Sequence, residues 1–419
     1  MASSKLYSGR VWYPYTQMQA LEAPREIVRG EGVWLYAGDG SRHLDAISSW
    51  WVTLHGHAEP RIVEAIARQA RTLEQVILAE YTHPLAEELA ERLVRITPPG
   101  LEHVFYSDDG STAVEVALKM ALQCWQQRRL PGRRRILALE NAYHGDTLAA
   151  MSVSEATAFT APFAEWMFPV ERVPADDLGP LEALLAARGE EVAALIVEPL
   201  LQGVGGMRVQ TPEFLRGLRR LCDQHQVLLI ADEVLTGFGR TGTMFACEQA
   251  GISPDVMCLS KGLTGGALPM AATLCTDAVY EAFLSGDRER TLFHGHSFTG
   301  NALGCAAAMA SLDVFAEEPV MERIAAIAAT HSRCLERLRR HPRVRAVRQA
   351  GTVAAVELRD AGQGYLAEVA LRLRRYYEQR GVLLRPLGPV VYVLPPYRTQ
   401  TSELEWVWEV ITTSLNEIA

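Results

Sequence analysis

The stretch "VLLIADEVLTG", residues 227–237, decides the fold class, because five apolar residues run without interruption to Asp232. "DVMCLSKGLTGG", residues 255–266, repeats this order with Lys261 after its own apolar run. Further apolar runs that end in polar or glycine residues are "VFYSDDGS" (104–111), "ILALENAYHGD" (136–146), "AALIVEPLLQG" (193–203) and "AATLCT" (271–276). Helical patterns occupy most of the gaps. Continuous apolar strands that alternate with helices predict an α/β fold, whose mostly parallel central sheet is covered by helices and binds ligands beyond the carboxyl ends of its strands.

The two ends of the chain have a different pattern. "VWLYAGDGSRHLDA", residues 33–46, predicts a hairpin around residues 38–40, and "VLLRPLGPVVYVLPP", residues 382–396, predicts two strands joined at residues 386–389. Amphipathic helices surround the second segment. We therefore expect residues 1–60 and 310–419 to form a smaller α+β domain beside a large cofactor-binding α/β domain over residues 61–309.

The charge balance and the cysteines limit the class of protein. A net charge of −9 and a pI near 5.7 argue against nucleic acid or an anionic membrane surface as a partner, and favour a small molecule. Seven cysteines without a C-x-x-C pair indicate reduced, buried thiols. The histidines lack metal-binding spacing, the first residues lack an apolar signal segment, and no apolar stretch reaches membrane-spanning length. We expect a cytoplasmic protein without a metal.

Lys261 is one of three lysines against thirty-eight arginines, and it is the only formal charge within residues 256–276. Burial of an ammonium lowers its pKa and produces an amine that attacks carbonyls and forms Schiff bases, which arginine cannot do. The alternative is a lysine whose head reaches solvent. Lys119, four residues after Glu115 on an expected helix, has the spacing of a surface ion pair, and Lys5 lies in a polar N-terminal stretch. Any lysine chemistry therefore belongs to Lys261.

Two further features concern a phosphate group and a cation. Thr112-x-x-Glu115 resembles a capping box, which places the start of a helix near Gly110 and Ser111. Free N–H groups and the helix dipole at this start can hold a phosphate, although many such starts are only caps. Asp232, behind an apolar strand, is costly unless it meets a cation, either of the protein or of a ligand.

Other motifs are less specific. "GFGRTG", residues 237–242, matches G-x-G-x-x-G, but residues 232–236 separate it from the preceding strand, which disfavours a dinucleotide site. The aromatic pairs Trp50–Trp51 and Tyr143–His144 either wall a pocket or pack in the core. Arg385, among apolar residues, suits bidentate capture of a carboxylate or an internal ion pair.

A phosphate-holding helix start, a strand-end Asp and a strand-end Lys together match the needs of pyridoxal 5'-phosphate. "IADEVLTGFGRTG" (230–242) followed by "SKGLTGG" (260–266) closely resembles the class III aminotransferases of the fold type I pyridoxal-phosphate family. Within this family, "WYPYTQM", "SSWW", "GSTAVEVALKMALQ", "NAYHGDT", "FGRTGTMFACE" and "LLRPLGPVVYVLPPY" resemble the members that act in biotin synthesis. The resemblance runs from about Trp12 to Tyr397.

The resemblance implies a role for each candidate residue. Lys261 would hold the cofactor covalently, Asp232 would contact its pyridine nitrogen, and both would be catalytic together with Tyr15. Tyr143 would stack on the ring. Gly110 and Ser111 would hold the phosphate, joined across a homodimer interface by His296 and Ser297 of the partner subunit. The implied substrate contacts are Tyr15, Trp50, Trp51, Tyr143, Asp146, Arg240, Gly295, Arg385 and Tyr392.

The resemblance also implies the reaction. An amino group would pass from S-adenosylmethionine to 8-amino-7-oxononanoate and give 7,8-diaminononanoate, with Arg385 on the distal carboxylate of the acceptor. His296 and Ser297 match the residues of the branch that uses lysine as donor, whereas Tyr392 matches the branch that uses S-adenosylmethionine. We favour S-adenosylmethionine as the donor. Asp109 stands where the family usually has Ser, and a carboxylate there weakens a phosphate site unless it turns away.

Two rival functions remain at this point. A broad-specificity ω-aminotransferase would share the cofactor, although "SSWW" and "WYPYT" argue against it. A nicotinamide-dependent dehydrogenase would use "GFGRTG" as its dinucleotide turn. A yellow protein that borohydride reduces excludes the dehydrogenase.

Overall fold

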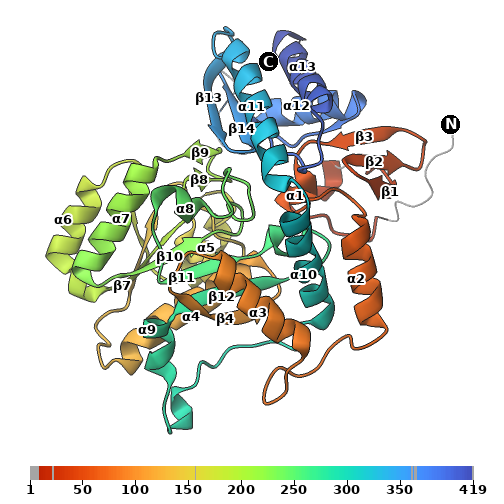
Figure 1. Cartoon of the computed structure of the whole chain (residues 1–419). Coiled ribbons are helices and arrows are strands. Elements are labelled where there is room, and N and C mark those ends of the chain that lie inside the picture. The colour runs from red at the N-terminus through yellow and green to blue at the C-terminus, as the bar shows by residue number, and fades with distance from the viewer. Residues whose placement is uncertain (1–8, 21–22, 156, 360–361, 363–365, 418–419) are drawn as a thin grey trace.

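A seven-stranded sheet forms the centre of the computed structural model, which describes residues 9–20, 23–155, 157–359, 362 and 366–417 (Figure 1). Neighbouring strands are parallel except at β12, which is antiparallel to both β11 and β4. The predicted mostly parallel sheet is therefore confirmed. In spatial order the strands are β4 (Leu101–Ser107), β12 (Ala271–Thr276), β11 (Val256–Leu259), β10 (Leu228–Asp232), β7 (Val192–Val197), β5 (Arg135–Leu139) and β6 (Glu171–Val173).

Helices cover both faces of this sheet, which explains why every residue of β7 and β10 is buried. One face packs against α4 (Gly110–Gln127) and α5 (Leu148–Val153). The other face packs against α6 (Gly179–Arg188), α7 (Pro212–His225) and α8 (Ala246–Ala250). Near the β4 edge lie α2 (Pro60–Ala70), α3 (Pro84–Ile96) and α10 (Ala302–Glu317), while α9 (Asp277–Tyr280) follows β12.

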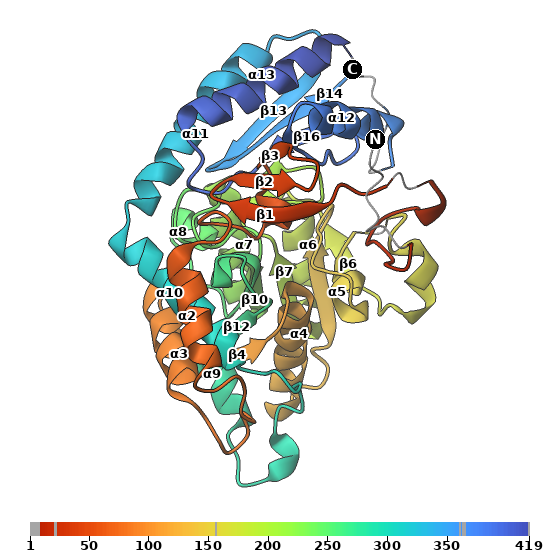
Figure 2. The same ribbon diagram turned by 90° about the vertical axis from the view of Figure 1, so that its right-hand side faces the viewer.

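The two ends of the chain meet in a four-stranded sheet. The expected hairpin is confirmed as β2 (Trp34–Ala37) and β3 (Arg42–Asp45), with β1 (Ile27–Glu31) on its outer side and β15 (Val382–Leu383) parallel to β3. Figures 1 and 2 both show these first strands beside the last part of the chain. This pairing supports the proposed division of the chain, in which residues 1–60 and 310–419 form one smaller domain.

The prediction of two strands within residues 382–396, joined at residues 386–389, is confirmed. Both strands exist, but β15 joins the sheet of β3, whereas β16 (Val390–Val393) pairs with β14 (Val353–Leu358) next to β13 (Val344–Ala350). The turn between them therefore connects two sheets instead of closing a hairpin. Around it pack α11 (Val320–Leu338), α12 (Glu368–Gln379) and α13 (Thr401–Glu417), while the short pair β8 (Leu201–Gln202) and β9 (Arg208–Val209) belongs to the central part of the chain.

The remaining elements are short. A four-residue turn α1 (Ser48–Trp51) follows β3, and 3₁₀ turns cover Met18–Ala20, Ala161–Trp166, Gly189–Glu191, Lys261–Thr264, Glu281–Phe283 and Arg288–Arg290. All seven cysteines are free and buried, as expected. Within the described ranges, no helix has the length and apolar character that crossing a bilayer requires. Lys5 lies outside the described residues.

Candidate active site

Polar side chains that follow strands of the central sheet converge on one cavity of about 670 Å³. The loops after β4, β5, β7, β10 and β11 all contribute to its lining, as expected for the carboxyl ends of parallel strands. The cavity is lined by seven of the fifteen candidate site residues, namely Gly110, Ser111, Tyr143, Asp146, Asp232, Lys261 and Trp51.

Helix α4 begins at Gly110, as expected, but a different residue caps it. The carboxylate of Asp109 accepts a hydrogen bond from the backbone N–H of Thr112 at 2.9 Å, so the capping box is Asp109–Thr112. Glu115 instead accepts from Thr147 Oγ1 at 2.5 Å and from the backbone N–H of Ala149 at 2.9 Å. The Thr112–Glu115 box is therefore wrong, and the carboxylate of Asp109 takes up one N–H group of the helix start.

The expected ion pair of Lys119 is also wrong. Lys119 Nζ donates to the carbonyl oxygen of Phe293 at 2.7 Å and lies 3.2 Å from His294 Nδ1. Glu115, the expected partner, is occupied by the start of α5. Lys119 thus links residues 293–294 to helix α4.

The start of α4 leaves room for a phosphate. In the described part of the chain, no acceptor is bonded to the backbone N–H of Gly110 or Ser111. A Cβ at Gly110 would lie 2.6 Å from Val234 Cγ1, and a Cβ at Gly145 would lie 2.2 Å from Ser111 Oγ. Gly145 also has a φ of +131°, which side chains rarely adopt. Both glycines are therefore required by close approach of neighbouring chain segments.

Asp232 ends β10 in a buried position and is held in place by two contacts. Its Oδ2 lies 2.7 Å from His144 Nδ1, and its Oδ1 accepts from the backbone N–H of Val234 at 3.1 Å. No partner among the described residues bonds the buried Nε2 atom of His144. Within the described ranges no arginine pairs with Asp232, and His144 is the side chain that orients this carboxylate.

Lys261 follows β11 with a φ of +38°, in the left-handed region that costs a non-glycine residue free energy. Burial lowers the pKa of its ammonium, and the nearby carboxylates of Asp232 and Glu198 oppose that effect only in part. Its Nζ lies 5.0 Å from the centroid of the Trp51 ring. The side chain therefore points into the cavity and not toward bulk solvent.

Glu198 is a site residue that our sequence reasoning missed. It is buried directly after β7, where its carboxylate accepts from the backbone N–H groups of Tyr143 at 3.0 Å and Gly203 at 2.9 Å. Burial raises its pKa to about 7. The signal was present, because Glu198 follows a wholly apolar strand in the same way as Asp232 does.

The turn α1 separates the two adjacent tryptophans. Ser48, Ser49 and Trp51 all have positive φ values of 51°, 60° and 70°. The buried carboxylate of Asp45 holds this turn, since it accepts from the backbone N–H of Ser49 at 2.6 Å and lies 2.9 Å from His57 Nε2. Trp51 is buried at the cavity, whereas Trp50 is 43% exposed. The strained turn thus places Trp51 at the cavity and Trp50 partly in solvent.

A row of aromatic and charged side chains leads outward from Tyr143. Tyr15 donates a short hydrogen bond to Asp146, and its hydroxyl lies 3.4 Å from that of Tyr143. Its ring lies 5.7 Å from Trp50, and the guanidinium of Arg385 lies 5.2 Å from the same tryptophan. Burial raises the pKa of Tyr143, and its hydrogen bond with Tyr15 adds to the effect. Tyr15, Trp50 and Arg385 therefore lie together, although they line no part of the 670 Å³ cavity.

Two of the other candidates lie behind the cavity wall. The hydroxyl of Tyr392 accepts from Trp51 Nε1 at 3.0 Å, so Tyr392 supports the tryptophan that lies next to Lys261. Arg240 is buried, and its guanidinium donates to the carbonyl oxygens of Pro395 at 2.9 Å and Thr53 at 3.3 Å. It ties three segments together, and a direct substrate contact of Arg240 stays a prediction.

The expected contribution of a partner subunit concerns the segment around Gly295. In the single chain, His296 Nε2 lies 3.8 Å from Asp108 Oδ1, and His296 Nδ1 accepts from the backbone N–H of Phe298 at 3.2 Å. Gly295 and Ser297 are exposed. Their roles in a dimer stay predictions, but the segment ends next to the residues that start α4.

The cavity fits pyridoxal phosphate on these observations. The free N–H groups of Gly110 and Ser111 suit its phosphate, the oriented carboxylate of Asp232 suits a protonated pyridine nitrogen, and the amine of Lys261, which lines the cavity, suits its aldehyde. Asp109 does not contradict this, since its carboxylate turns to the N–H of Thr112.

Comparisons with known proteins agree with the geometry. The family described as aminotransferase class-III matches residues 15–415. An adenosylmethionine-8-amino-7-oxononanoate aminotransferase of Synechococcus elongatus is 48% identical, over 97% of this chain and 99% of its own length. A crystal structure of an enzyme of the same name from Methanocaldococcus jannaschii superposes with a TM-score of 0.93 at 36% identity and covers 98% of this chain and 97% of its own. A PLP-bound amine transaminase from an uncultivated Pseudomonas species gives 0.91 at 30% identity, with coverage of 98% and 99%.

Proposed function

The chain belongs to the class III aminotransferases, and on this premise we propose that it transfers the amino group of S-adenosylmethionine to 8-amino-7-oxononanoate, giving 7,8-diaminononanoate for biotin synthesis. The observation that carries the proposal is the meeting of Lys261, Asp232 and the start of α4 in one cavity, in a chain that is similar over nearly its full length to enzymes with this name. The free, buried cysteines support a cytoplasmic location.

Pyridoxal phosphate is the cofactor of this family, and the residues described above would hold it. When bound, it supplies an aldehyde that carries the amino group and a ring that takes up electrons from the α-carbon of the substrate. Lys261 would anchor it, Gly110 and Ser111 would hold the phosphate, and Tyr143 would cover the ring. Asp232 would keep the pyridine nitrogen protonated, in an orientation set by His144.

Lys261 would also move the proton. Burial lowers the pKa of the Lys261 ammonium and so favours the neutral amine, whose Nζ can accept the proton from the α-carbon of the donor. The same Nζ can deliver a proton to the carbon of the acceptor that receives the amino group. Trp51, whose ring lies 5.0 Å from Nζ, would keep water away from this atom.

The row from Tyr143 to Arg385 would bind the substrates. The amino and keto groups react at Lys261, so a long acceptor must extend away from it along Tyr15 and Trp50. Arg385, stacked on Trp50, would then meet the distal carboxylate. Tyr392 would act on donor choice through Trp51, to which it is hydrogen bonded.

A homodimer belongs to the proposal. Phe293 and Phe298, on both sides of Gly295, are 69% and 63% exposed in the single chain. Large apolar side chains on one exposed segment are typical of a surface that another subunit covers. In the dimer, His296 and Ser297 of the partner subunit would complete the phosphate site.

The test is a half-reaction with separate donors. Purified protein is mixed with S-adenosylmethionine or with lysine, and the near-visible absorbance of the bound cofactor is followed. We expect S-adenosylmethionine alone to bleach the band and 8-amino-7-oxononanoate to restore it, with no band in Lys261→Ala. Bleaching by lysine instead would make lysine the donor. Turnover of simple amines with pyruvate, without any restoration by 8-amino-7-oxononanoate, would establish the broad-specificity alternative.

A further inference from the structure

A second cavity, of about 1160 Å³, lies beside the one that contains Lys261. It is bounded by the loop after β5, by the turn between β8 and β9, and by strands β13 and β14 with the segment before β16. Tyr143, Gly145 and Asp146 line both cavities. The larger cavity therefore meets the reaction site at these three residues.

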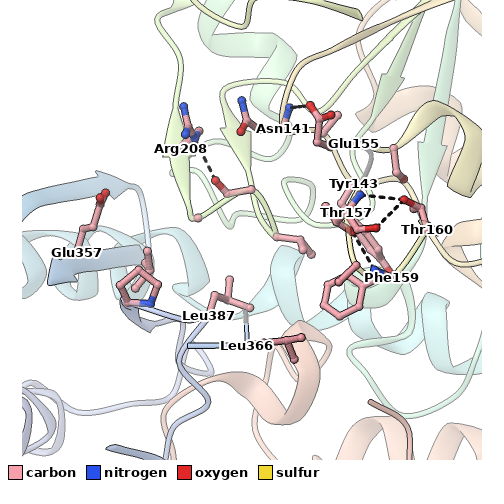
Figure 3. Close-up of a pocket in the computed structure, with 18 of the residues that line it drawn as sticks. Asn141, Tyr143, Glu155, Thr157, Phe159, Thr160, Arg208, Glu357, Leu366 and Leu387 are labelled. Carbon is pink, nitrogen blue, oxygen red and sulfur yellow. Dashed lines mark hydrogen bonds between the residues drawn. The ribbon is translucent and has the colours of Figure 1, made fainter. Parts of the chain in front are cut away.

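The wall that faces Tyr143 carries an excess of arginine. Figure 3 shows Arg208 and Glu357 on one side of this cavity and Tyr143 and Phe159 on the other. The four arginines of the lining are Arg208, Arg345, Arg348 and Arg359, and Glu357 is the carboxylate that lies among them. Glu357 pairs with Arg348 and, at 3.2 Å, with Arg345, so it balances only part of their charge.

Among the described residues, the outer Nη nitrogens of Arg208 and Arg359 have no hydrogen-bond acceptor. Arg208 Nε donates to the carbonyl oxygen of Gly205 at 3.1 Å, and Arg359 Nε donates to that of Val344 at 2.9 Å. These bonds hold each guanidinium by its inner nitrogen. Among the residues that the structure describes, no carboxylate forms an ion pair with either of them.

The carboxylates of the opposite wall have partners of their own. Asp146 accepts a hydrogen bond from Tyr15, and Glu155 accepts one from the backbone N–H of Asn141 at 2.8 Å. Both donors are neutral, so Asp146 and Glu155 keep their charge, and the excess of positive charge lies on the side of the arginines, where Glu357 is the carboxylate of the lining. This matters because the whole chain carries a net charge of −9, which repels an anionic substrate from most of the surface.

We propose that the arginine wall of Arg208, Arg345, Arg348 and Arg359 is a carboxylate-capture site, which draws the distal carboxylate of the long-chain acceptor into the larger cavity on its way to Lys261. The inference rests on the proposed function and adds an anion site separate from Arg385, which lines neither cavity and stacks on Trp50. Arginines that line a cavity focus the field on an entering anion and raise its rate of capture.

The test compares the acceptor with its neutral methyl ester. In the holoenzyme, Arg208→Gln/Arg359→Gln should lower kcat/KM for 8-amino-7-oxononanoate by roughly tenfold at low salt, the lower end of the range for such focusing. It should leave kcat, the value for the ester and the donor half-reaction unchanged, and it should weaken the salt dependence. Arg95→Gln/Arg220→Gln is the matched control, since these exposed arginines on α3 and α7 line neither cavity. An unchanged cofactor band and melting temperature would show that the variant is folded.

Two results would overturn the inference. Equal kcat/KM values for the acid in the unsubstituted protein and the double variant would show that these arginines are only solvated. Equal losses for acid and ester, or the same loss in the control variant, would show a structural or non-specific charge effect. If the unsubstituted protein transfers no amino group to 8-amino-7-oxononanoate, the proposed function and the inference both fail, and this result is distinct from the other two.

Discussion

Gly145→Ala is the substitution that tests the phosphate site most directly. The added Cβ would stand 2.2 Å from Ser111 Oγ and 2.7 Å from Ser111 Cβ, whereas ordinary contacts begin at 3.4 Å. Ser111 and the first residues of α4 must therefore move by roughly 1 Å, which misplaces their donors by enough to weaken hydrogen bonds. The φ of +131° at this position adds a cost of about 1–3 kcal/mol for a residue with a Cβ.

These two costs have separate readouts. Loss of one charge-assisted hydrogen bond to a phosphate is worth about 1.5–3 kcal/mol, so the Kd for pyridoxal phosphate should rise roughly 10- to 100-fold. The strained φ should lower the free energy of unfolding of the apoprotein as well. Titration of the apoprotein with pyridoxal phosphate, followed by the absorbance of the bound cofactor, gives the Kd, and urea unfolding gives the stability.

Gly132→Ala is the control, because nothing lies within 4 Å of a Cβ at Gly132 and its φ is outside the left-handed region. It should leave both quantities nearly unchanged. If Gly145→Ala binds pyridoxal phosphate as tightly as the parent protein, then α4 and Ser111 do not hold the phosphate, and the assignment of the cavity is wrong.

Three further predictions concern buried charged or titratable groups. Burial raises the pKa of Glu198 to about 7, so the folded state keeps a proton that the unfolded state releases near pH 4.5. The free energy of unfolding therefore falls as pH rises from 4.5 to 7. Glu198→Gln should flatten this pH dependence in urea unfolding at pH 5 and 7, and an unchanged difference between the two pH values would refute the raised pKa. Burial lowers the pKa of His55 and of His331 to about 3, so between pH 6.5 and 3 the unfolded state binds protons that the folded state does not. Each histidine therefore lowers the free energy of unfolding by about 1.4 kcal/mol per pH unit as pH falls. His331, whose Nδ1 accepts from Trp408 Nε1 at 3.0 Å, is neutral in the folded state, and His331→Gln should remove its contribution to this pH dependence. Arg240→Met should lower the free energy of unfolding by ~3 kcal/mol or more, because it leaves the carbonyl oxygens of Pro395 and Thr53 buried without a donor. A midpoint of urea unfolding equal to that of the parent protein would show that these hydrogen bonds do not stabilise the fold.

The alternation of apolar runs and helices was sufficient to predict the class of the fold, because a strand covered on both faces has to be apolar throughout. Asp232 and Lys261 could be found for the same reason, as polar residues at the ends of such strands. Glu198 obeys the same rule after β7, and the rule was simply not applied there. Its burial and raised pKa could have been anticipated from the sequence alone.

Other features depend on contacts between distant segments and leave no local signal. Thr112 and Glu115 have the spacing of a capping box, but Glu115 accepts a hydrogen bond from Thr147 in the loop before α5. Asp109 caps the helix instead, by accepting from the backbone N–H of Thr112. The two strands within residues 382–396 were predicted, but nothing in their own sequence indicates that β15 pairs with β3 and β16 pairs with β14. In both cases the contacts that the local pattern does not reveal are made with residues far away in the chain.

The strained turn α1 shows how the smaller part of the molecule controls the site. Positive φ values at Ser48, Ser49 and Trp51 are costly, and they persist because the buried Asp45 binds the backbone of Ser49 on one side and His57 on the other. Asp45 ends β3, the strand that pairs with β15 near the end of the chain. The position of Trp51 next to Lys261 therefore depends on the pairing of the two ends of the chain. A change in that pairing would alter the surroundings of the Lys261 amine although no residue of the central sheet is changed.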